Sequence, residues 1–160
     1  RQKKNICKYL DIPMQHISDN MLASMRRGIT KEKTMELVEK IRERVPGIAI
    51  RTTLICGYPG ETQKDHEDVL KWLEESKFER LGVFTYSHEE NTHAHLLKDN
   101  VPPSVKKKRV EAVMKLQQKI SFVANKKMIG KTLKVLFDRK ERDRIIASPF
   151  EYDNKGSSIK

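Results

Sequence analysis

The sequence contains only two cysteines among its 160 residues, Cys7 and Cys56. Two thiols cannot build a disulfide framework, so we expect a protein of a reducing compartment. No stretch approaches the roughly 18–20 apolar residues of a membrane span, and no signal-peptide pattern opens the chain. The expectation is therefore a cytoplasmic protein without a membrane anchor.

Several motifs of enzyme active sites are also missing. The sequence has no phosphate-binding loop ending in Gly-Lys-Ser/Thr, no nucleophile elbow, no Ser/His/Asp triad signature and no zinc-protease motif. His88, His93 and His95 lie close enough in sequence to ligate zinc, but neither cysteine is near them and a loop supplies no second shell. We therefore expect neither a metal ligand nor a catalytic residue within this chain.

The composition nevertheless supports a folded protein. Hydrophobic residues make up 37% of the 18.7-kDa chain, enough for one domain with a modest core. Charged residues make up 34%, and 33 Lys and Arg against 22 Asp and Glu give a net charge of +11. This charge is concentrated: residues 102–134 hold ten basic residues and one acid, Glu111. Such a segment either attracts a polyanion such as RNA or a ribosome surface, or is a solvated helix face.

Hydrophobic periodicity predicts alternating strands and helices in the first hundred residues. Ser18 or Asp19 caps a short helix with Arg26 and Arg27 in its last turn, and Thr30 caps the next helix. The run from Ile48 to Cys56 is β-branched and is expected to be buried on both faces. The predicted order is strand 8–15, helix 19–27, helix 31–44, strand 48–56, helix 63–76 and strand 81–86.

A loop with three histidines then leads to a long helix that begins at Pro102-Pro103 and ends near 128–130. Its expected apolar stripe is Val110, Val113, Met114, Gln117, Ile120, Val123 and Ala124. Residues 132–138 alternate like an edge strand, after Arg139 the pattern decays, and residues 154–160 carry no core signal. The fold class is therefore α/β, with about three parallel strands, too few to close a barrel, followed by a basic helix and the start of a β unit.

The turn Gly57-Tyr-Pro-Gly-Glu-Thr62 follows the most apolar strand and precedes a helix. Ligands of α/β proteins bind at this position, outside the carboxyl ends of parallel strands. A tight turn without a ligand is the simpler interpretation. Within the turn, Glu61 either accepts backbone amides or contacts a ligand.

Three stretches together resemble the radical S-adenosylmethionine (SAM) methylthiotransferases. They are Tyr9-Leu-Asp-Ile-Pro-Met-Gln-His-Ile-Ser18 with Met25-Arg-Arg27, Arg51-Thr-Thr-Leu-Ile-Cys-Gly-Tyr-Pro-Gly-Glu-Thr62, and Phe84-Thr-Tyr-Ser-His-Glu-Glu-Asn-Thr-His-Ala94. They are similar to the fourth, fifth and sixth strands of the family's barrel with their following loops. Asn91 departs from the pattern, since a glycine is usual there.

Within that family the sequence is most similar to the branch that modifies an aspartate of a small-subunit ribosomal protein. Asp11, the pair Gln15-His16, Thr53 and the pair Glu89-Glu90 distinguish it from the tRNA-modifying branch. The resemblance implies methylthio insertion at the aspartate β-carbon, with SAM as radical source and methyl donor. The tRNA-modifying enzyme, and a non-catalytic module that binds RNA or the ribosome, remain as alternatives.

The resemblance also implies a domain organisation and a site. Residues 1–100 correspond to the C-terminal half of a radical SAM barrel, 101–130 to a basic connecting helix and 131–160 to a truncated TRAM-like β segment. Two 4Fe-4S clusters are implied for the full-length protein, with cysteine ligands that this chain lacks. Residues expected to contact SAM are Gln15, Ser18, Arg26, Leu54, Ile55, Gly57, Phe84 and Tyr86.

Overall fold

Three parallel strands and four helices form most of the protein. The computed structural model describes residues 7–132, together with the backbone of 135–141 and 144–149. In chain order, the elements are β1 (Tyr9–Gln15), α1 (Asp19–Ser24), α2 (Lys31–Arg44), β2 (Ala49–Cys56), α3 (Gln63–Ser76), β3 (Arg80–Thr85), a 3₁₀ turn η1 (His93–Leu96), α4 (Pro103–Lys126), β4 (Val135–Glu141) and β5 (Arg144–Pro149). The first three strands pair in the order β1-β2-β3, all parallel, which confirms the predicted α/β class.

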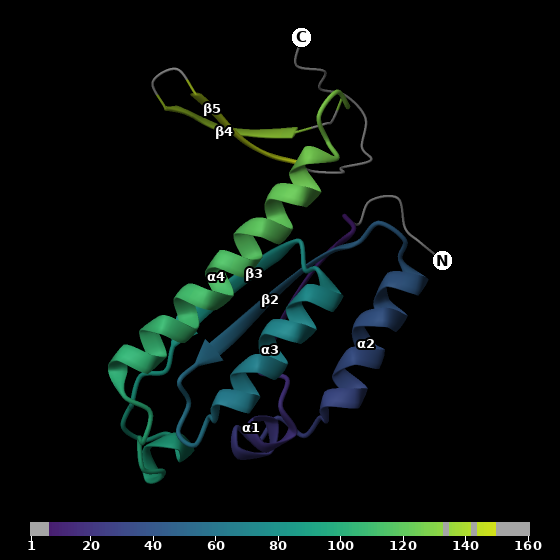
Figure 1. The fold of residues 1–160 in the computed structure, drawn as a ribbon. Helices are drawn as coiled ribbons and strands as arrows, with labels where there is room; N and C mark the ends of the chain where they lie inside the picture. Colours follow the sequence, from purple (N-terminus) through teal and green to yellow (C-terminus); the bar gives the residue numbers. More distant parts are fainter. Residues whose placement is uncertain (1–6, 133–134, 142–143, 150–160) are drawn as a thin grey trace.

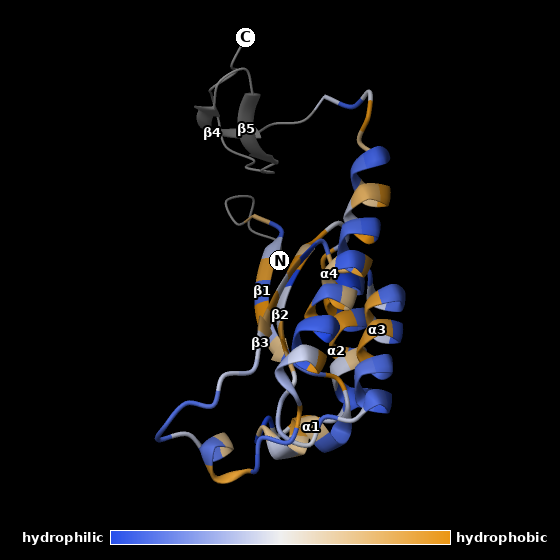
Figure 2. Cartoon of the chain, turned by 60° about the vertical axis from the view of Figure 1, so that its left-hand side comes forward, coloured by the Kyte–Doolittle hydropathy of each residue, from blue (hydrophilic) through white to orange (hydrophobic). Residues whose placement is uncertain are grey.

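Helices α2, α3 and α4 lie on the same side of this sheet (Figures 1 and 2). The core forms between these helices and the sheet face that they cover. Ile50 and Leu54 of β2 are fully buried there against Leu73 of α3 and Val113 of α4. Trp72 packs edge-on against Phe78 with ring centroids 5.0 Å apart. One face of the sheet therefore has a continuous apolar layer.

The prediction that β2 is buried on both faces is wrong. Its burial alternates: Ile50, Thr52, Leu54 and Cys56 are buried, while Arg51 is exposed. Thr53 and Ile55 are half-buried on the face opposite the helices. Because no helix of the described residues covers that second face, only every second side chain enters the core.

The predicted helix starts at Thr30 and Thr62 are confirmed. Each threonine hydroxyl accepts a hydrogen bond from the backbone N–H three residues on, and Thr62 forms a complete capping box with Asp65. Helix α1 is shorter than predicted, because it ends at Ser24 and Arg26 has a left-handed backbone, with φ 56°. Arg26 and Arg27 therefore follow the helix and do not lie in its last turn.

Helix α4 buries different residues from those of the predicted stripe. Val113 and Gln117 are buried as expected, but Met114 is 37% and Val123 55% exposed. In their place the buried face includes two cations, Lys106 and Arg109, whose partners lie in the loops below the helix. The spacing of apolar residues did not indicate this face. Ion pairs of Lys106 and Arg109, and not apolar contacts, attach this part of α4 to the loops.

Strands β4 and β5 form a separate antiparallel pair. The prediction of a strand near 132–138 is confirmed, and a second strand, β5, covers Arg144–Pro149, where the sequence pattern had weakened. Residues 150–160 lie outside the described part. None of the helices in the described ranges combines the length and apolar character that a membrane crossing requires. The domain boundaries at 100 and 130 remain predictions.

Gly57 connects β2 to the turn before α3 and lies directly beneath α4. Its φ is +80°, in the left-handed region that side chains disfavour. A Cβ at this position would meet the Lys106 side chain, 2.8 Å from Cδ and 2.9 Å from Cβ. Glycine is needed here for two reasons, its backbone conformation and the closeness of a buried lysine stem.

We predict that Gly57→Ala lowers the free energy of unfolding by more than Gly28→Ala does. Gly28 has φ +63° but nothing within 4 Å of its added Cβ, so that variant incurs only the left-handed backbone cost of about 1–2 kcal/mol. Urea unfolding of both variants measures the difference. Adding Lys106→Ala to Gly57→Ala removes the contacts with Cγ and Cδ but leaves the one with Cβ, and it also removes the Lys106 ion pair, so the comparison is made against Lys106→Ala alone. Equal losses of stability at Gly57 and Gly28 would contradict the close-packing explanation.

Candidate functional site

A hollow of about 280 Å³ opens where β1 and β2 end, beside the segment that follows α1. Its walls come from the end of β1, the segment after α1, the end of β2 with the following turn, and η1. The lining residues are Gln15, Ser24, Met25, Arg26, Arg27, Ile55, Tyr58, His93 and Ala94. The volume is near the lower end for small-molecule sites, and the mixture of apolar and cationic groups is typical of them.

Three of the eight predicted site residues line this hollow. Gln15 comes from β1, Ile55 from β2, and Arg26 from the segment after α1. Gln15 pairs with Leu54 of β2. Because β1 and β2 run parallel, their last residues lie at the same edge of the sheet. The ends of β1 and β2 therefore meet at this hollow.

Two further predicted residues lie beside the hollow. Tyr86 follows β3, and its ring packs edge-on against the Tyr58 ring that lines the hollow, with centroids 5.2 Å apart. Phe84 pairs with Ile55 in the sheet and is 60% exposed. Phe84 therefore lies on the face of the sheet that the helices leave open, whereas the Tyr86 ring also has the Lys106 ammonium of α4 4.9 Å from its centroid.

The side chains of Ser18 and Leu54 do not line the hollow, and Gly57 lies outside its lining too. Leu54 is 1% exposed and points into the core, because neighbouring residues of a strand face opposite sides. The Ser18 hydroxyl donates a 2.5 Å hydrogen bond to Asp65 Oδ1. Gly57 donates its N–H to Glu61. Ser18 and Gly57 thus hold the segments around the hollow in place without lining it.

Sequence reasoning missed several lining residues. Tyr58 lies in the glycine turn and its hydroxyl donates to the Ser24 carbonyl at 3.2 Å, joining two walls of the hollow. Arg27 donates from Nη2 to the Pro13 carbonyl at 2.7 Å. The signal for Arg27 was its position next to Arg26. No periodic pattern indicated that His93, from a distant loop, also reaches this site.

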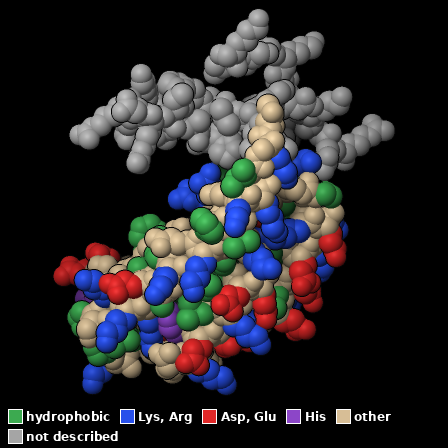
Figure 3. Space-filling view, turned by 45° about the horizontal axis from the view of Figure 1, so that its top comes forward, with side chains coloured by type: hydrophobic (Ala, Val, Ile, Leu, Met, Phe, Trp, Pro, Cys, Tyr) green, Lys and Arg blue, Asp and Glu red, His purple; other side chains and the backbone are tan. Residues whose placement is uncertain are grey.

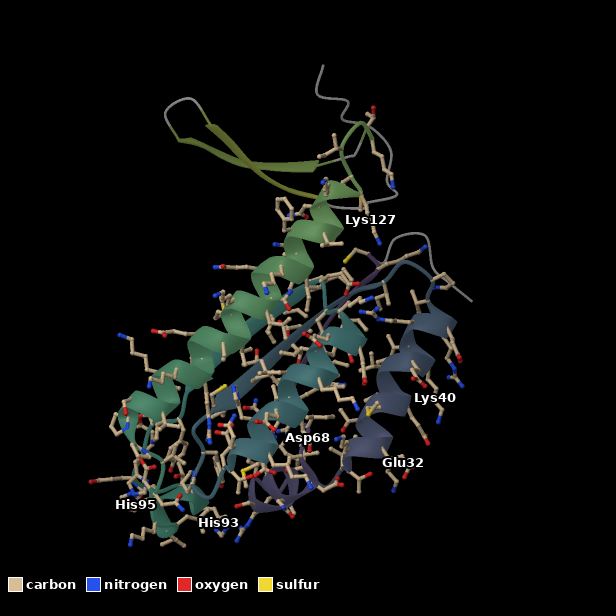
Figure 4. All side chains as sticks on the ribbon, in the orientation of Figure 1. Glu32, Lys40, Asp68, His93, His95 and Lys127 are labelled. Atoms are coloured by element: carbon tan, nitrogen blue, oxygen red, sulfur yellow. The ribbon has the colours of Figure 1, made fainter. Side chains whose placement is uncertain are left out.

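The histidine loop closes one side of the hollow. Asn91 has φ 62°, a left-handed backbone that suits asparagine as well as the glycine usual in the resembling family. The Thr92 hydroxyl then accepts from His95 N–H and starts η1. His93 and His95 lie at this edge, at the opposite end of α4 from Lys127 (Figure 4). Within the described residues no three His, Cys, Asp or Glu side chains gather as metal ligands.

A fully buried carboxylate, Glu61, lies under the site. Its Oε2 accepts the Gly57 amide and lies 3.2 Å from Arg109 Nη1, which also donates to the Glu61 carbonyl at 3.0 Å. Its Oε1 faces His16 Nε2 at 3.6 Å and His66 Nδ1 at 4.0 Å. The structure thus confirms that Glu61 accepts a backbone amide of the turn. The Glu61 carboxylate connects the residue that follows β1, the turn, α3 and α4.

Electrostatics keep this carboxylate ionised. Burial would raise the Glu61 pKa, but His16, the Gly57 amide and Arg109 together lower it below its ordinary value of 4.5. The pKa of His66 is lowered by burial, so its ring stays neutral. Burial, with Glu61 nearby, raises the pKa of the Cys56 thiol to about 12. Cys56 is therefore a protonated core side chain, as its position in an apolar strand predicted.

On the open face of the sheet, Arg51 Nη1 lies 3.2 Å from Asp11 Oδ2 of the neighbouring strand. Arg51 is thus paired with an acidic side chain within the sheet.

We predict that acid weakens the fold through Glu61. Because the folded pKa lies below 4.5, the stabilisation is complete above pH 4.5 and is lost as the pH falls through the folded value. Glu61→Gln should cost about 3–5 kcal/mol at pH 7, since it leaves Arg109 buried without its charge partner, and the deficit should shrink toward pH 3. Urea unfolding between pH 7 and 3 measures both. The exposed Glu36→Gln serves as control, and a deficit independent of pH would contradict the assignment.

The chain is similar in sequence to known proteins. Residues 1–73 match the Radical SAM superfamily. The chain is 51% identical over 154 residues to the ribosomal protein uS12 methylthiotransferase RimO of Christiangramia forsetii, covering 96% of this chain and 34% of that protein. It is 53% identical to the RimO of Cytophaga hutchinsonii, over 88% of this chain and 32% of that protein. For Chloroherpeton thalassium the identity is 48%, over 96% and 35%.

The chain thus spans about a third of the length of these curated relatives. The resemblance to radical SAM methylthiotransferases of the RimO type, which three sequence stretches predicted, is confirmed for a segment of that length.

Proposed function

We propose that the full-length protein carrying this segment is a methylthiotransferase that modifies an aspartate of ribosomal protein uS12, at its β-carbon, in the cytoplasm. The observation that carries the proposal is the hollow at the strand ends, where Gln15, Arg26 and Ile55 come together. The relatives at 48–53% identity bear the name ribosomal protein uS12 methylthiotransferase. Parallel α/β sheets bind small ligands at this edge, outside the carboxyl ends of their strands.

The residues of the hollow fit part of a SAM molecule. Ile55 and Tyr58 offer apolar surface for an adenine ring, and Gln15 offers an amide to ribose hydroxyls. Arg26, which has no ion-pair partner among the described residues, suits the carboxylate of the amino acid end. When bound, SAM supplies the methyl group and the means of breaking an unactivated C–H bond. These residues bind and orient it and exclude water.

The iron–sulfur clusters implied by the family do not fit the described part of this chain. Cysteine ligands bind iron as thiolates, whereas Cys56 is buried and its pKa is raised to about 12. Cys7 lies 49 positions away in sequence, and the described residues gather no group of three ligands. We therefore propose that the cluster ligands are cysteines outside this chain.

The tRNA-modifying alternative is less well supported. The loop that borders the hollow carries Glu89 and Glu90, both exposed, and the Ser87 hydroxyl holds Glu89 at 2.6 Å. Carboxylates at the entrance would repel a phosphate backbone. A protein substrate presents no such repulsion, which favours uS12.

We predict that Arg26→Ala in the full-length protein weakens SAM binding by roughly 10- to 100-fold, the loss expected for a hydrogen bond to a charged group. Equilibrium dialysis measures the affinity, and Arg44→Ala, an exposed arginine at the end of α2, serves as control. Mass spectrometry of the products tests the substrate. A methylthio group on tRNA and none on uS12 would reject the proposed activity, and unchanged affinity would remove Arg26 from the site.

We further propose that α4 contacts RNA of the ribosome. Its residues Lys108, Lys115, Lys119 and Lys126 are exposed and lie 7, 4 and 7 positions apart. At 3.6 residues per turn these intervals keep all four within about 20° of one line down the helix, roughly 6–10 Å apart. Such a row matches a polyanion better than scattered lysines would.

Two details of the structure refine this surface. Lys106 and Arg109 belong to the basic segment but are buried and paired with Asp99 and Glu61, so they are not offered to a partner. Phe122 lies between Lys119 and Lys126 in sequence and is 67% exposed, so it offers a ring on which a base can stack. The charge pattern of the sequence did not indicate this residue. In the space-filling view, Lys and Arg side chains lie among hydrophobic ones on this side of the molecule (Figure 3).

We predict that replacing Lys115 and Lys119 together by alanine lowers the salt dependence of RNA binding by about two units of slope, one for each lysine that no longer neutralises a phosphate. Filter binding of ribosomal RNA at several salt concentrations measures the slope. The matched control replaces Lys33 and Lys40, exposed on α2. An equal effect of the control pair would mean that only net charge matters. RNA binding by a full-length protein that binds no SAM would favour the non-catalytic module.

A further inference from the structure

The end of strand β1 has an unusual backbone at Gln15. Its φ is 70°, one of four positive values among the described non-glycine residues. The N–H of His16 donates to the carbonyl of Met14 at 2.9 Å, which encloses Gln15 in a three-residue γ-turn. A γ-turn whose central residue has positive φ is rare and strained. Strain of this kind persists only where the surroundings hold it, and it collects at functional sites.

The register of the sheet changes at the same place. Ile12 pairs with Thr52 and Gln15 with Leu54, so three steps along β1 match two along β2. An extra residue of this kind bends a strand and turns the following side chain in a new direction. Here the side chain that follows is Gln15, which lines the hollow. The irregularity therefore directs Gln15 toward the site.

The next residue, His16, is anchored through its side chain. It is 1% exposed, and its Nδ1 accepts a hydrogen bond from the Ser18 amide at 3.0 Å. A ring nitrogen that accepts carries no proton, so the ring proton of neutral His16 is on Nε2, which faces Glu61 Oε1 at 3.6 Å. The imidazole thus ties the chain after Gln15 to the amide two residues on and to the buried carboxylate.

The residues on either side are held as firmly. Met14 is buried and its N–H donates to Thr52 Oγ1 at 3.3 Å. Ile17 is fully buried, and the Ser18 hydroxyl donates to Asp65, whose other oxygen accepts from Thr62. Gln15 is therefore a half-buried residue between two immobilised neighbours.

We propose that His16 is a positioning residue, which keeps the left-handed backbone of Gln15 and so holds the Gln15 side chain at the ligand. The identity of the ligand, SAM, rests on the proposed function. The positioning itself rests on the γ-turn, the register change and the contacts of the imidazole.

A double-mutant cycle in the full-length protein tests the proposal, with SAM as the probe. His16→Leu should weaken affinity by about 10-fold in the wild-type background and by little in the Gln15→Ala background, because its effect passes through Gln15. His16→Asn, whose side-chain oxygen can still accept from the Ser18 amide, should retain most of the affinity. Val38→Ala, a buried change on α2, should lower stability and leave affinity unchanged.

Crystal structures of the same variants provide a second measurement. We expect φ of Gln15 to become negative in His16→Leu and to stay positive in His16→Asn. Equal losses of affinity in both backgrounds, or an unchanged Gln15 backbone in His16→Leu, would overturn the proposal. If the unsubstituted full-length protein binds no SAM, the proposed function fails, whereas the backbone conformation still decides the role of His16. If His16→Leu does not fold, the SAM affinities of His16→Asn and Gln15→Ala and the Gln15 backbone in His16→Asn still test the proposal. A loss of affinity in His16→Asn with the Gln15 backbone unchanged would contradict it.

Discussion

The structure depends on a single buried carboxylate. Glu61 is removed from water entirely, and such a charge is tolerated only where hydrogen bonds and an opposite charge replace its hydration. The Gly57 amide and Arg109 do so, and two histidines face the remaining oxygen. Because these partners come from β1, the turn after β2, α3 and α4, one ionised group determines how four segments meet beneath the hollow.

This arrangement positions the segments that form the walls of the hollow. Gly57 must approach Glu61 and Lys106 closely, which fixes the turn that carries Tyr58. His16 faces the same carboxylate and ends β1 in the conformation that directs Gln15 toward the hollow. Apart from the buried Tyr58, the residues that line the hollow are exposed or half-buried, while Glu61, His16 and Arg109 beneath them are buried and charged or polar. This division explains why Ser18 and Gly57 belong to the motifs without lining the site.

The open face of the sheet is the second constraint on how this segment functions. Helices cover one side of β1, β2 and β3 (Figure 2). Thr53 and Ile55 are half-buried and Phe84 is exposed on the other side. Ile55 and Phe84 pair across neighbouring strands, so apolar surface continues from the hollow along the sheet. The surface of α4, in contrast, is divided lengthwise into a buried face with two paired cations and a solvent face with a row of lysines.

The sequence by itself determined the elements whose signals are local. Thr30 and Thr62 indicated helix starts because a hydroxyl caps the amide three residues on, and β-branched runs indicated strands. Three motifs indicated the family and Gln15, Arg26 and Ile55 as neighbours. Only the tertiary structure decided the burial of Lys106 and Arg109, the one-sided burial of β2, the γ-turn at Gln15 and the approach of His93. Each of these depends on partners distant in the chain, and a pattern of neighbouring residues carries no information on which distant charge, helix or loop packs against it.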